Sequence, residues 1–380
     1  MEVLLDVTNL GLSFGTHLTR TGIFRATERL VRQLFGHPEV TARVAALQSY
    51  VGEVQLARFD RAEGGWLAKG WTSAWENPAA TLEEALAFAD RLLSAGAADL
   101  ERRRLTARLG LLNRVARPRR LPSGVDVYHS LRPPLVDRGR VESRVRAVTV
   151  HDMIPCLLPH VVEDWFGAQH RAVLASIDRR RDWIVCHSMR TKADVCEITG
   201  TAPDRVFVTP LAAAPEVFRP EPDRDRIASV TARHGIPPGD YVLSLCTLEP
   251  RKNLPRLVRA FYALVESQRL HDLRLVLVGP LGWKAEPLFA ALDAGPGLRE
   301  RVVLTGFVPD EDLSAVYSGA RVFVFPSLYE GFGLPALEAM QCGIPVITSR
   351  TGSLPEVVGP DALTVDPTDE AALAQAMLDV

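Results

Sequence analysis

Two glutamates frame the segment whose residue types and spacing most clearly suggest chemistry. From Glu330 to Ser349 the chain reads Glu-Gly-Phe-Gly-Leu-Pro-Ala-Leu-Glu-Ala-Met-Gln-Cys-Gly-Ile-Pro-Val-Ile-Thr-Ser, so that seven residues separate Glu330 from Glu338. Glycines let a ligand approach the main chain closely, and the first N–H groups of a helix have no partner within it. Such a helix start favours an anionic ligand, and two carboxylates suit one that also carries hydroxyl groups. The structural alternative is a strand–loop–helix turn whose acid complements the helix dipole.

A second polar cluster, Glu249-Pro-Arg-Lys-Asn, follows a predicted strand at residues 241–245 and precedes a predicted helix. Adjacent cations at the carboxyl end of a strand suit a diphosphate, because Arg251 offers a planar fork of donors and Lys252 a compact charge. The structural alternative is a solvated loop in which Asn253 is the N-cap of the next helix.

The first half of the chain contains weaker signals. His151 and Asp152 follow an apolar run, so an imidazole and a carboxylate would lie where a strand ends, although a single His in this position is commonly structural. The loop at 11–22 contains three glycines, and Gly22 begins a predicted helix, which suits the binding of an anion by backbone N–H groups. Ser188 is most simply a helix N-cap.

The composition narrows the class of protein. A chain of 380 residues with 47% hydrophobic and 24% charged residues fits two globular α/β domains. The net charge of −2 gives no reason to expect nucleic acid as a partner. The five cysteines are scattered without a C-x-x-C pair, so we expect reduced thiols in a cytoplasmic protein, with no zinc site. The motifs of dinucleotide-binding folds, P-loops and serine esterases are absent from the sequence.

Short apolar runs alternate with helix-length segments along the whole chain. Because the runs are apolar throughout, they predict parallel strands covered on both faces, in doubly wound sheets. The runs of the first half are 3–7, 43–47, 125–129, 145–151, 183–186 and 206–209. Those of the second half are 241–245, 273–278, 302–305, 322–325, 344–348 and 362–365.

A proline-punctuated stretch at 210–222 suits a linker between the two halves. We therefore predict two Rossmann-like domains, at 1–215 and 222–380. Ligands of such sheets bind at the carboxyl ends of the strands, which would face one another across a cleft.

One segment departs from this alternation. Residues 81–120 are predicted to be helical, and eight arginines lie between Arg102 and Arg120. Leucines 105, 109 and 112 and Val115 recur at helical spacing, which makes the segment basic and amphipathic. A solvated helix face is one interpretation. Peripheral contact with anionic lipid, or with an acceptor that carries phosphate, is the other.

Together these clusters resemble the retaining family-4 glycosyltransferases of the GT-B fold. The resemblance covers nearly the whole chain and follows the family's order. Its elements are the glycine loop through Gly22, His151-Asp152, Arg251-Lys252, Gly306-Phe-Val308, and Glu330 with Glu338. The spacing from Glu330 to Glu338, with its surrounding residues, is the most specific of these.

The resemblance implies a role for each polar residue. Arg251 and Lys252 would bind the donor's diphosphate and stabilise the leaving group. Glu330 would accept hydrogen bonds from hydroxyls of the donor sugar, and Glu338 would bind the ribose hydroxyls. His151 would contact the sugar from the opposite domain.

Other parts of the donor site would be formed by the main chain. Backbone N–H groups near Phe332, Gly333 and Leu334 would bind the sugar and the phosphates. Main chain near Val308 would bind the base. Gly22 would lie close to the diphosphate, and Asp152 would border the site beside His151.

The resemblance also implies the reaction. A hexose would move from a nucleoside-diphosphate sugar to a glycan or lipid-linked saccharide with retention of anomeric configuration. No metal or other cofactor is expected, because fixed cations replace Mg²⁺. GDP-mannose is the favoured donor, and UDP- and dTDP-sugars remain open. The alternatives are transfer to a soluble sugar or sugar phosphate, and a non-catalytic GT-B protein that binds nucleotide or glycan. Family members usually continue beyond the point that corresponds to Val380, so we expect the natural chain to be longer.

Overall fold

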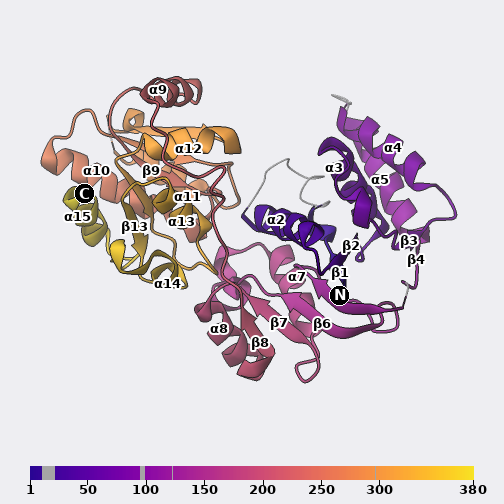
Figure 1. The fold of residues 1–380 in the computed structure, drawn as a ribbon. Helices are drawn as coiled ribbons and strands as arrows, with labels where there is room; N and C mark the ends of the chain where they lie inside the picture. Colours follow the sequence, from indigo (N-terminus) through magenta and orange to yellow (C-terminus); the bar gives the residue numbers. More distant parts are fainter. Residues whose placement is uncertain (11–21, 95–98, 122, 296) are drawn as a thin grey trace. The chain divides into compact units, whose positions relative to one another are not determined.

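The computed structural model describes residues 1–10, 22–94, 99–121, 123–295 and 297–380. It contains two six-stranded sheets (Figure 1). The first has the order β2-β1-β5-β6-β7-β8, and its pairs from β2 to β7 are parallel. Its strands are β1 (Glu2–Asp6), β2 (Thr41–Ala45), β5 (Val125–Ser130), β6 (Ser143–Thr149), β7 (Trp183–Cys186) and β8 (Val206–Val208).

The second sheet is parallel throughout and has the order β11-β10-β9-β12-β13-β14. Numbered within the sheet, this is the order 3-2-1-4-5-6 of a Rossmann fold. Successive strands are added on one side of β9 up to β11 and on the other side from β12 onward, so the strand order reverses between β9 and β12. Its strands are β9 (Tyr241–Leu245), β10 (Arg274–Val278), β11 (Val302–Gly306), β12 (Val322–Phe325), β13 (Val346–Ser349) and β14 (Leu363–Val365).

Every predicted strand is therefore present, with ends shifted by a few residues at most. The structure adds a ribbon of two antiparallel strands that the sequence analysis did not predict, β3 (Trp75–Glu76) with β4 (Arg117–Pro118). The helices are α2 (Gly22–Gly36), α3 (Tyr50–Ala62), α4 (Leu82–Ser94), α5 (Asp99–Val115), α6 (Ile154–Leu157), α7 (Asp164–Ala175), α8 (Met189–Thr199), α9 (Arg224–Arg233), α10 (Leu254–Gln268), α11 (Glu286–Asp293), α12 (Asp310–Ser318), α13 (Leu334–Gln341), α14 (Leu354–Val358) and α15 (Glu370–Asp379).

The chain forms two compact units. The first comprises Met1–His151, Ala168–Cys186 and Val195–Phe207. The second comprises Asp152–Gly167, His187–Asp194 and Val208–Val380. Two short segments from the first half of the sequence thus pack with the second unit, and the single boundary at 215–222 stays a prediction.

The core of the second unit explains why its strands form. In β12, Phe323 and Phe325 are fully buried, as expected for a strand covered on both faces. Helix α10 contributes Leu257, Phe261 and Leu264, which recur at helical spacing and belong to the same apolar cluster. This packing fixes the ends of the central strands, where the polar clusters begin.

The basic segment forms α4 and α5, the end of which leads into β4. Leu109 and Leu112 are buried in a cluster that includes Tyr50 of α3 and Leu86 of α4. The side of α5 that carries Leu109 and Leu112 therefore packs against α3 and α4, whereas Val115 is 37% exposed.

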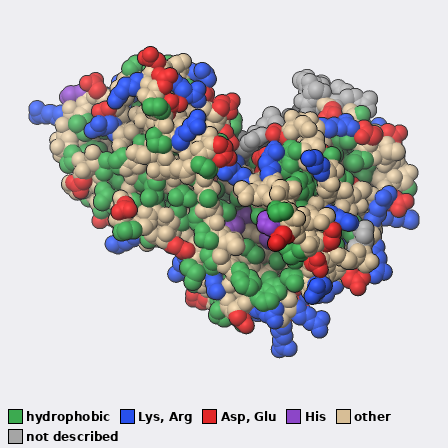
Figure 2. All heavy atoms as spheres, viewed as in Figure 1, with side chains coloured by type: hydrophobic (Ala, Val, Ile, Leu, Met, Phe, Trp, Pro, Cys, Tyr) green, Lys and Arg blue, Asp and Glu red, His purple; other side chains and the backbone are tan. Residues whose placement is uncertain are grey.

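Acidic and basic side chains are interspersed on the face of the molecule drawn in Figure 2. Among the described residues, no helix combines the length and apolar character that a membrane span requires.

Candidate active site

The two most informative sequence clusters meet at the switch point of the second sheet. Arg251 and Lys252 follow β9, and Glu330 follows β12. These two strands are hydrogen-bonded neighbours, with Val242 beside Val322. In open α/β sheets, ligands bind outside the carboxyl ends of the strands at this point of reversal. The topology therefore places both clusters where a ligand is expected.

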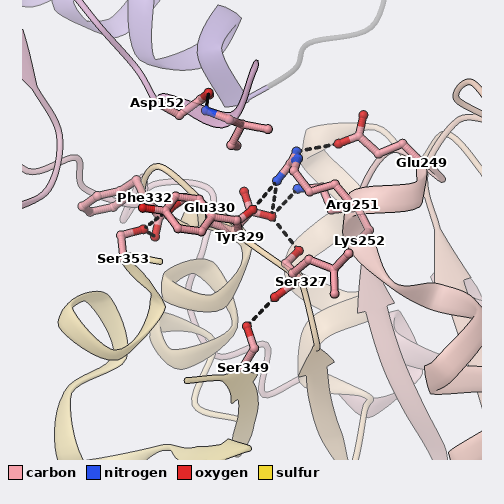
Figure 3. A network of polar contacts seen from close by, with 12 residues as sticks. Asp152, Glu249, Arg251, Lys252, Ser327, Tyr329, Glu330, Phe332, Ser349 and Ser353 are labelled. Atoms are coloured by element: carbon pink, nitrogen blue, oxygen red, sulfur yellow. Dashed lines mark hydrogen bonds and ion pairs between the residues drawn. The ribbon is translucent and has the colours of Figure 1, made fainter. Parts of the chain in front are cut away.

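Glu330 lies at the centre of a compact ion cluster (Figure 3). Its Oε1 is 2.6 Å from Arg251 Nη1 and 2.7 Å from Lys252 Nζ. Ser327 Oγ donates to the same oxygen at 2.6 Å. Burial by itself would raise the pKa of Glu330, but Arg251 and Lys252 outweigh burial and hold that pKa at about 2. Glu330 is therefore a carboxylate at neutral pH.

Arg251 makes further contacts that fix its plane. Its Nη2 lies 2.5 Å from Glu249 Oε1, and its Nη1 donates to the carbonyl oxygen of Tyr329 at 2.9 Å. Burial would lower the pKa of Arg251, but Glu330 and Glu249 raise it above its ordinary value. Two cations and two carboxylates thus balance one another in this cluster.

The alternative interpretation of residues 249–253 as a solvated helix start is wrong. Lys252 is only 8% exposed. Asn253 occupies the N-cap position of α10, but its side chain makes no capping bond. It donates instead to the carbonyl oxygens of Pro326 and Pro367, at 3.1 and 2.7 Å. This residue thus ties the cation loop to the ends of two other strands.

The carbonyl oxygens of the loop between β12 and α13 accept hydrogen bonds from donors elsewhere in the protein, most of them side chains. Ser353 donates from its N–H to Glu330 O at 3.2 Å and from its Oγ to Phe332 O at 2.7 Å. The other donors are Ser349 to Ser327 O, Thr351 to Leu328 O, Arg251 to Tyr329 O, and Ser188 with Thr191 to Gly331 O.

The backbone N–H groups of the same loop differ from its carbonyl groups. Within the part of the chain that the structure describes, no N–H from Tyr329 to Gly333 donates a hydrogen bond. Gly333 has φ 113°, a conformation that favours glycine, and a Cβ there would lie 2.6 Å from Leu354 Cδ2. Consecutive N–H groups before a helix form a concave anion-binding surface. The predicted binding of an anion by the N–H groups near Phe332, Gly333 and Leu334 stays a prediction.

Glu338 lies one turn into α13. It is 1% exposed, and its Oε2 accepts a hydrogen bond from Tyr317 Oη at 3.1 Å. Val308 follows β11 and is buried in the apolar core of the second unit, so its predicted main-chain contact with the base stays a prediction. Gly306 turns the chain there with φ 71°.

The remaining predicted residues are in two different units. Asp152 belongs to the second unit, where its Oδ1 accepts from Ile154 N–H at 2.9 Å at the start of α6, and its charge helps to raise the pKa of Arg251. His151 and Gly22 belong to the first unit. His151 Nε2 lies 2.8 Å from Leu131 O, so this nitrogen carries a proton, and Gly22 is the first residue of α2. A joint site that includes these two residues stays a prediction.

Sequence reasoning missed the hydroxyl donors of the inward-facing carbonyls. Ser188 is an N-cap as predicted, since Thr191 N–H donates to its Oγ at 3.0 Å. Its second contact, with Gly331, joins residues 143 positions apart, and no spacing rule connects them. Ser353 is only 21 residues from Phe332, but no sequence motif around it predicts that it donates to the Phe332 carbonyl. Among the described residues, no group of three or more His, Cys, Asp or Glu side chains could hold a metal ion.

The second half of the chain is similar to a known family of sequences. Residues 239–380 match the family model described as Glycosyl transferases group 1. The O-antigen chain mannosyltransferase B of Escherichia coli is 38% identical over 254 residues, which cover 66% of this chain and 64% of that protein. An MMP alpha-(1->4)-mannosyltransferase of Mycolicibacterium hassiacum is 30% identical over 213 residues, 55% of this chain and 47% of that protein. The chain thus spans less than two thirds of the length of these relatives.

Solved structures share the fold over the whole chain. The Anabaena protein HepE, in complex with UDP and glucose, has a TM-score of 0.63 at 15% identity, covering 99% of this chain and 88% of that one. WaaG, a glycosyltransferase involved in lipopolysaccharide biosynthesis, has a TM-score of 0.61 at 15% identity, covering 100% and 90%. At these identities the likeness concerns the fold alone, and it confirms the predicted GT-B class. Residues 239–380 are therefore similar to the glycosyl transferases group 1 family, and the whole chain shares the GT-B fold.

Proposed function

We propose that this protein is a retaining glycosyltransferase that moves a hexose from a nucleoside-diphosphate sugar to a glycan or lipid-linked saccharide. The observation that carries the proposal is the cluster of Arg251, Lys252 and Glu330 at the switch point. Beside it lie the N–H groups of residues 329–333, which donate to no residue that the structure describes. A diphosphate needs fixed cations and backbone donors, and a sugar needs carboxylate acceptors. GDP-mannose is the favoured donor, which agrees with the names of the mannosyltransferase relatives.

In this proposal the cations act on the leaving group. Arg251 and Lys252 would stabilise the charge that develops on the diphosphate as the glycosidic bond breaks. Glu330 holds both cations in place before the donor arrives and would also accept from sugar hydroxyls. The acceptor would attack from the face that the diphosphate leaves, with a phosphate oxygen taking its proton. Glu330 would then not form a covalent intermediate, unlike the nucleophile of retaining hydrolases.

Two other functions use the same site. A soluble sugar or sugar phosphate could replace the lipid-linked acceptor, since the donor residues do not distinguish between acceptors. A non-catalytic GT-B protein would bind nucleotide or glycan without turnover. The presence of both cations and both glutamates favours an enzyme, because binding alone does not require charge stabilisation at the leaving group.

A panel of nucleoside diphosphates tests the proposal. We expect one of GDP, UDP, dTDP and ADP to raise the melting temperature, because a ligand at 100 times its Kd stabilises a protein by about 2.7 kcal/mol. GDP is the expected one. No shift with any of the four would contradict a nucleotide-sugar site.

Glu338 provides a prediction about nucleotide affinity. Glu338→Ala removes the proposed ribose acceptor and should weaken binding of the matching diphosphate by about tenfold, the effect of one charged hydrogen bond. Calorimetric titration measures this. The matched control is Glu370→Ala, because Glu370 is an exposed acid paired with Arg259 on the surface. An unchanged affinity in Glu338→Ala would refute the ribose assignment.

We further propose that the reaction needs no metal. Two fixed cations would supply the positive charge that Mg²⁺ supplies in other transferases. Transfer should therefore proceed at an unchanged rate after dialysis against EDTA. A rate that falls in EDTA and returns with added Mg²⁺ or Mn²⁺ would contradict metal independence.

Peripheral contact with the cytoplasmic face of a membrane remains part of the proposal. Arg108, Arg114 and Arg117 belong to a basic segment in which Leu109 and Leu112 are already packed, so charge would be the main attraction to anionic lipid. We expect the protein to sediment with phosphatidylserine vesicles at low salt and to be released as salt rises. Replacing these arginines by glutamine should abolish sedimentation. No sedimentation of the wild-type protein would exclude this contact.

A further inference from the structure

The start of α8 contacts the candidate donor loop, although it comes from the first half of the sequence. Ser188 Oγ lies 2.8 Å and Thr191 Oγ1 3.1 Å from Gly331 O. Both hydroxyl-bearing residues are almost fully buried, at 0% and 1% exposure. A carbonyl oxygen has two lone pairs and can accept from both donors. All three residues belong to the second unit, so this contact forms within one compact body.

Two other residues of α8, Arg190 and Asp194, contact Tyr329 in the same loop. Tyr329 Oη donates to Asp194, and Arg190 Nε donates to Tyr329 Oη at 2.9 Å. Arg190 Nη2 also pairs with Asp194 Oδ1 at 2.5 Å. Burial and the hydrogen bond to Asp194 raise the pKa of Tyr329 to about 12, so the phenol stays a neutral donor at physiological pH.

Helix α14 fixes the start of α8 from another direction. Glu356 accepts hydrogen bonds from the N–H groups of Met189 and Arg190, at 2.8 and 3.2 Å. A carboxylate at a helix N-terminus satisfies N–H groups that have no partner in the helix and complements its dipole. The donors Ser188 and Thr191 are therefore held in place before any ligand binds.

The planarity of the peptide bond connects this contact to ligand binding. In a trans peptide unit the carbonyl and the following N–H point in opposite directions. Fixing Gly331 O toward α8 therefore directs the N–H of Phe332 away from α8, to the side where the donor would bind. Gly331 has no Cβ, so its own conformation would not otherwise hold this peptide unit in one orientation.

We propose that Ser188 and Thr191 are positioning residues for the donor diphosphate, which act by orienting the peptide between Gly331 and Phe332. This proposal rests on the proposed function, because it requires that the loop binds a nucleoside diphosphate. Neither hydroxyl contacts the ligand. Their loss should lower affinity by allowing the Gly331–Phe332 peptide to rotate.

The test compares affinities for GDP and UDP, titrated separately by calorimetry into the full chain. Thr191→Val keeps the shape of the side chain and removes one donor, so we expect an affinity about three- to tenfold lower, the range for one hydrogen bond. Ser188→Ala combined with Thr191→Val should lower affinity by more than tenfold. Thr191→Ser keeps the hydroxyl and should restore binding to within about twofold of wild type, well inside the one-bond effect.

The matched control is Thr199→Val at the other end of α8. Thr199 Oγ1 donates to Val195 O within the helix at 2.6 Å, so this variant loses a helix hydroxyl without touching the loop. A purely structural effect would lower the melting temperature of Thr191→Val and Thr199→Val without changing either affinity. Wild-type affinity in both Thr191→Val and the double variant would overturn the positioning role. If the double variant does not fold, the affinities of Thr191→Val and Thr191→Ser alone test the positioning role.

The wild-type titration separates this proposal from the proposed function. If wild-type protein binds neither GDP nor UDP, and dTDP and ADP also fail, the donor site itself is wrong and the positioning role falls with it. If wild-type protein binds and the variants bind equally well, only the positioning role is wrong.

Discussion

Replacing Arg251 by alanine should lower kcat by about 10²- to 10³-fold, the loss typical of removing one donor that stabilises charge in the transition state. The guanidinium is 15% exposed and is oriented by Glu249, Glu330 and the Tyr329 carbonyl, so water cannot readily replace it. Because the interaction strengthens as the diphosphate leaves, the loss should appear in kcat more than in the KM for the donor. Steady-state rates with a saturating donor measure the effect.

Lys252→Ala should have an effect of similar size, because Lys252 contacts the same glutamate oxygen at 2.7 Å. The matched control is Arg259→Ala. Arg259 lies on α10 and pairs with Glu370 at a site where the two side chains are 43% and 39% exposed. This exposed pair should contribute little to stability and nothing to catalysis. Near-normal rates in both Arg251→Ala and Lys252→Ala would remove these residues from the proposed mechanism.

Glu330→Gln should destabilise the protein by up to about 3 kcal/mol at pH 7, and this difference should disappear in acid. The pKa of Glu330 is about 2 in the folded protein, against an ordinary value of 4.5. A lowered pKa means that the unfolded chain takes up a proton more readily than the folded protein. The contribution of the carboxylate is therefore fully present above pH 4.5 and is lost as the pH falls toward 2.

Urea unfolding between pH 2 and pH 7 measures this difference. The wild-type and Glu330→Gln proteins should converge in free energy of unfolding as the pH approaches 2. Glu370→Gln is the control, because an exposed acid should show a difference below about 1 kcal/mol over the same range. A difference between wild-type and Glu330→Gln that is the same at pH 2.5 and pH 7 would show that the ion cluster is not its source.

The strands of the second sheet could be predicted closely because their sequences favour a strand over a helix. Residues 241–245 and 322–325 are short apolar runs bounded by polar or turn residues, and both form strands with the predicted ends. A helix of that length would be marginal, whereas a buried strand of that length is ordinary. The position of Arg251 and Glu330 at strand ends follows directly. Their meeting at the switch point depends on the strand order, which the apolar runs do not determine.

The orientation of the peptide groups could not be predicted in the same way. Whether Gly331 turns its carbonyl inward depends on Ser188 and Thr191, which a tertiary contact brings to it from far along the chain. The helix that carries them begins in one compact unit and ends in the other, a division that composition does not mark. The side-chain contacts of Asn253 could not be predicted for a related reason. Its usual local role is capping, but the nearby carbonyls of Pro326 and Pro367 take its donors instead.

We propose that Arg251, Lys252 and Glu330 form the donor site of a nucleotide-sugar-dependent transferase. The most direct measurement is the release of nucleoside diphosphate from GDP-mannose, with UDP- and dTDP-hexoses in parallel, by wild-type protein and by Lys252→Ala. We predict that the wild-type protein releases diphosphate from one of these donors, with GDP-mannose expected, and that Lys252→Ala does so at least about 100-fold more slowly. Release at equal rates by both proteins, or no release and no binding with any donor, would contradict the account.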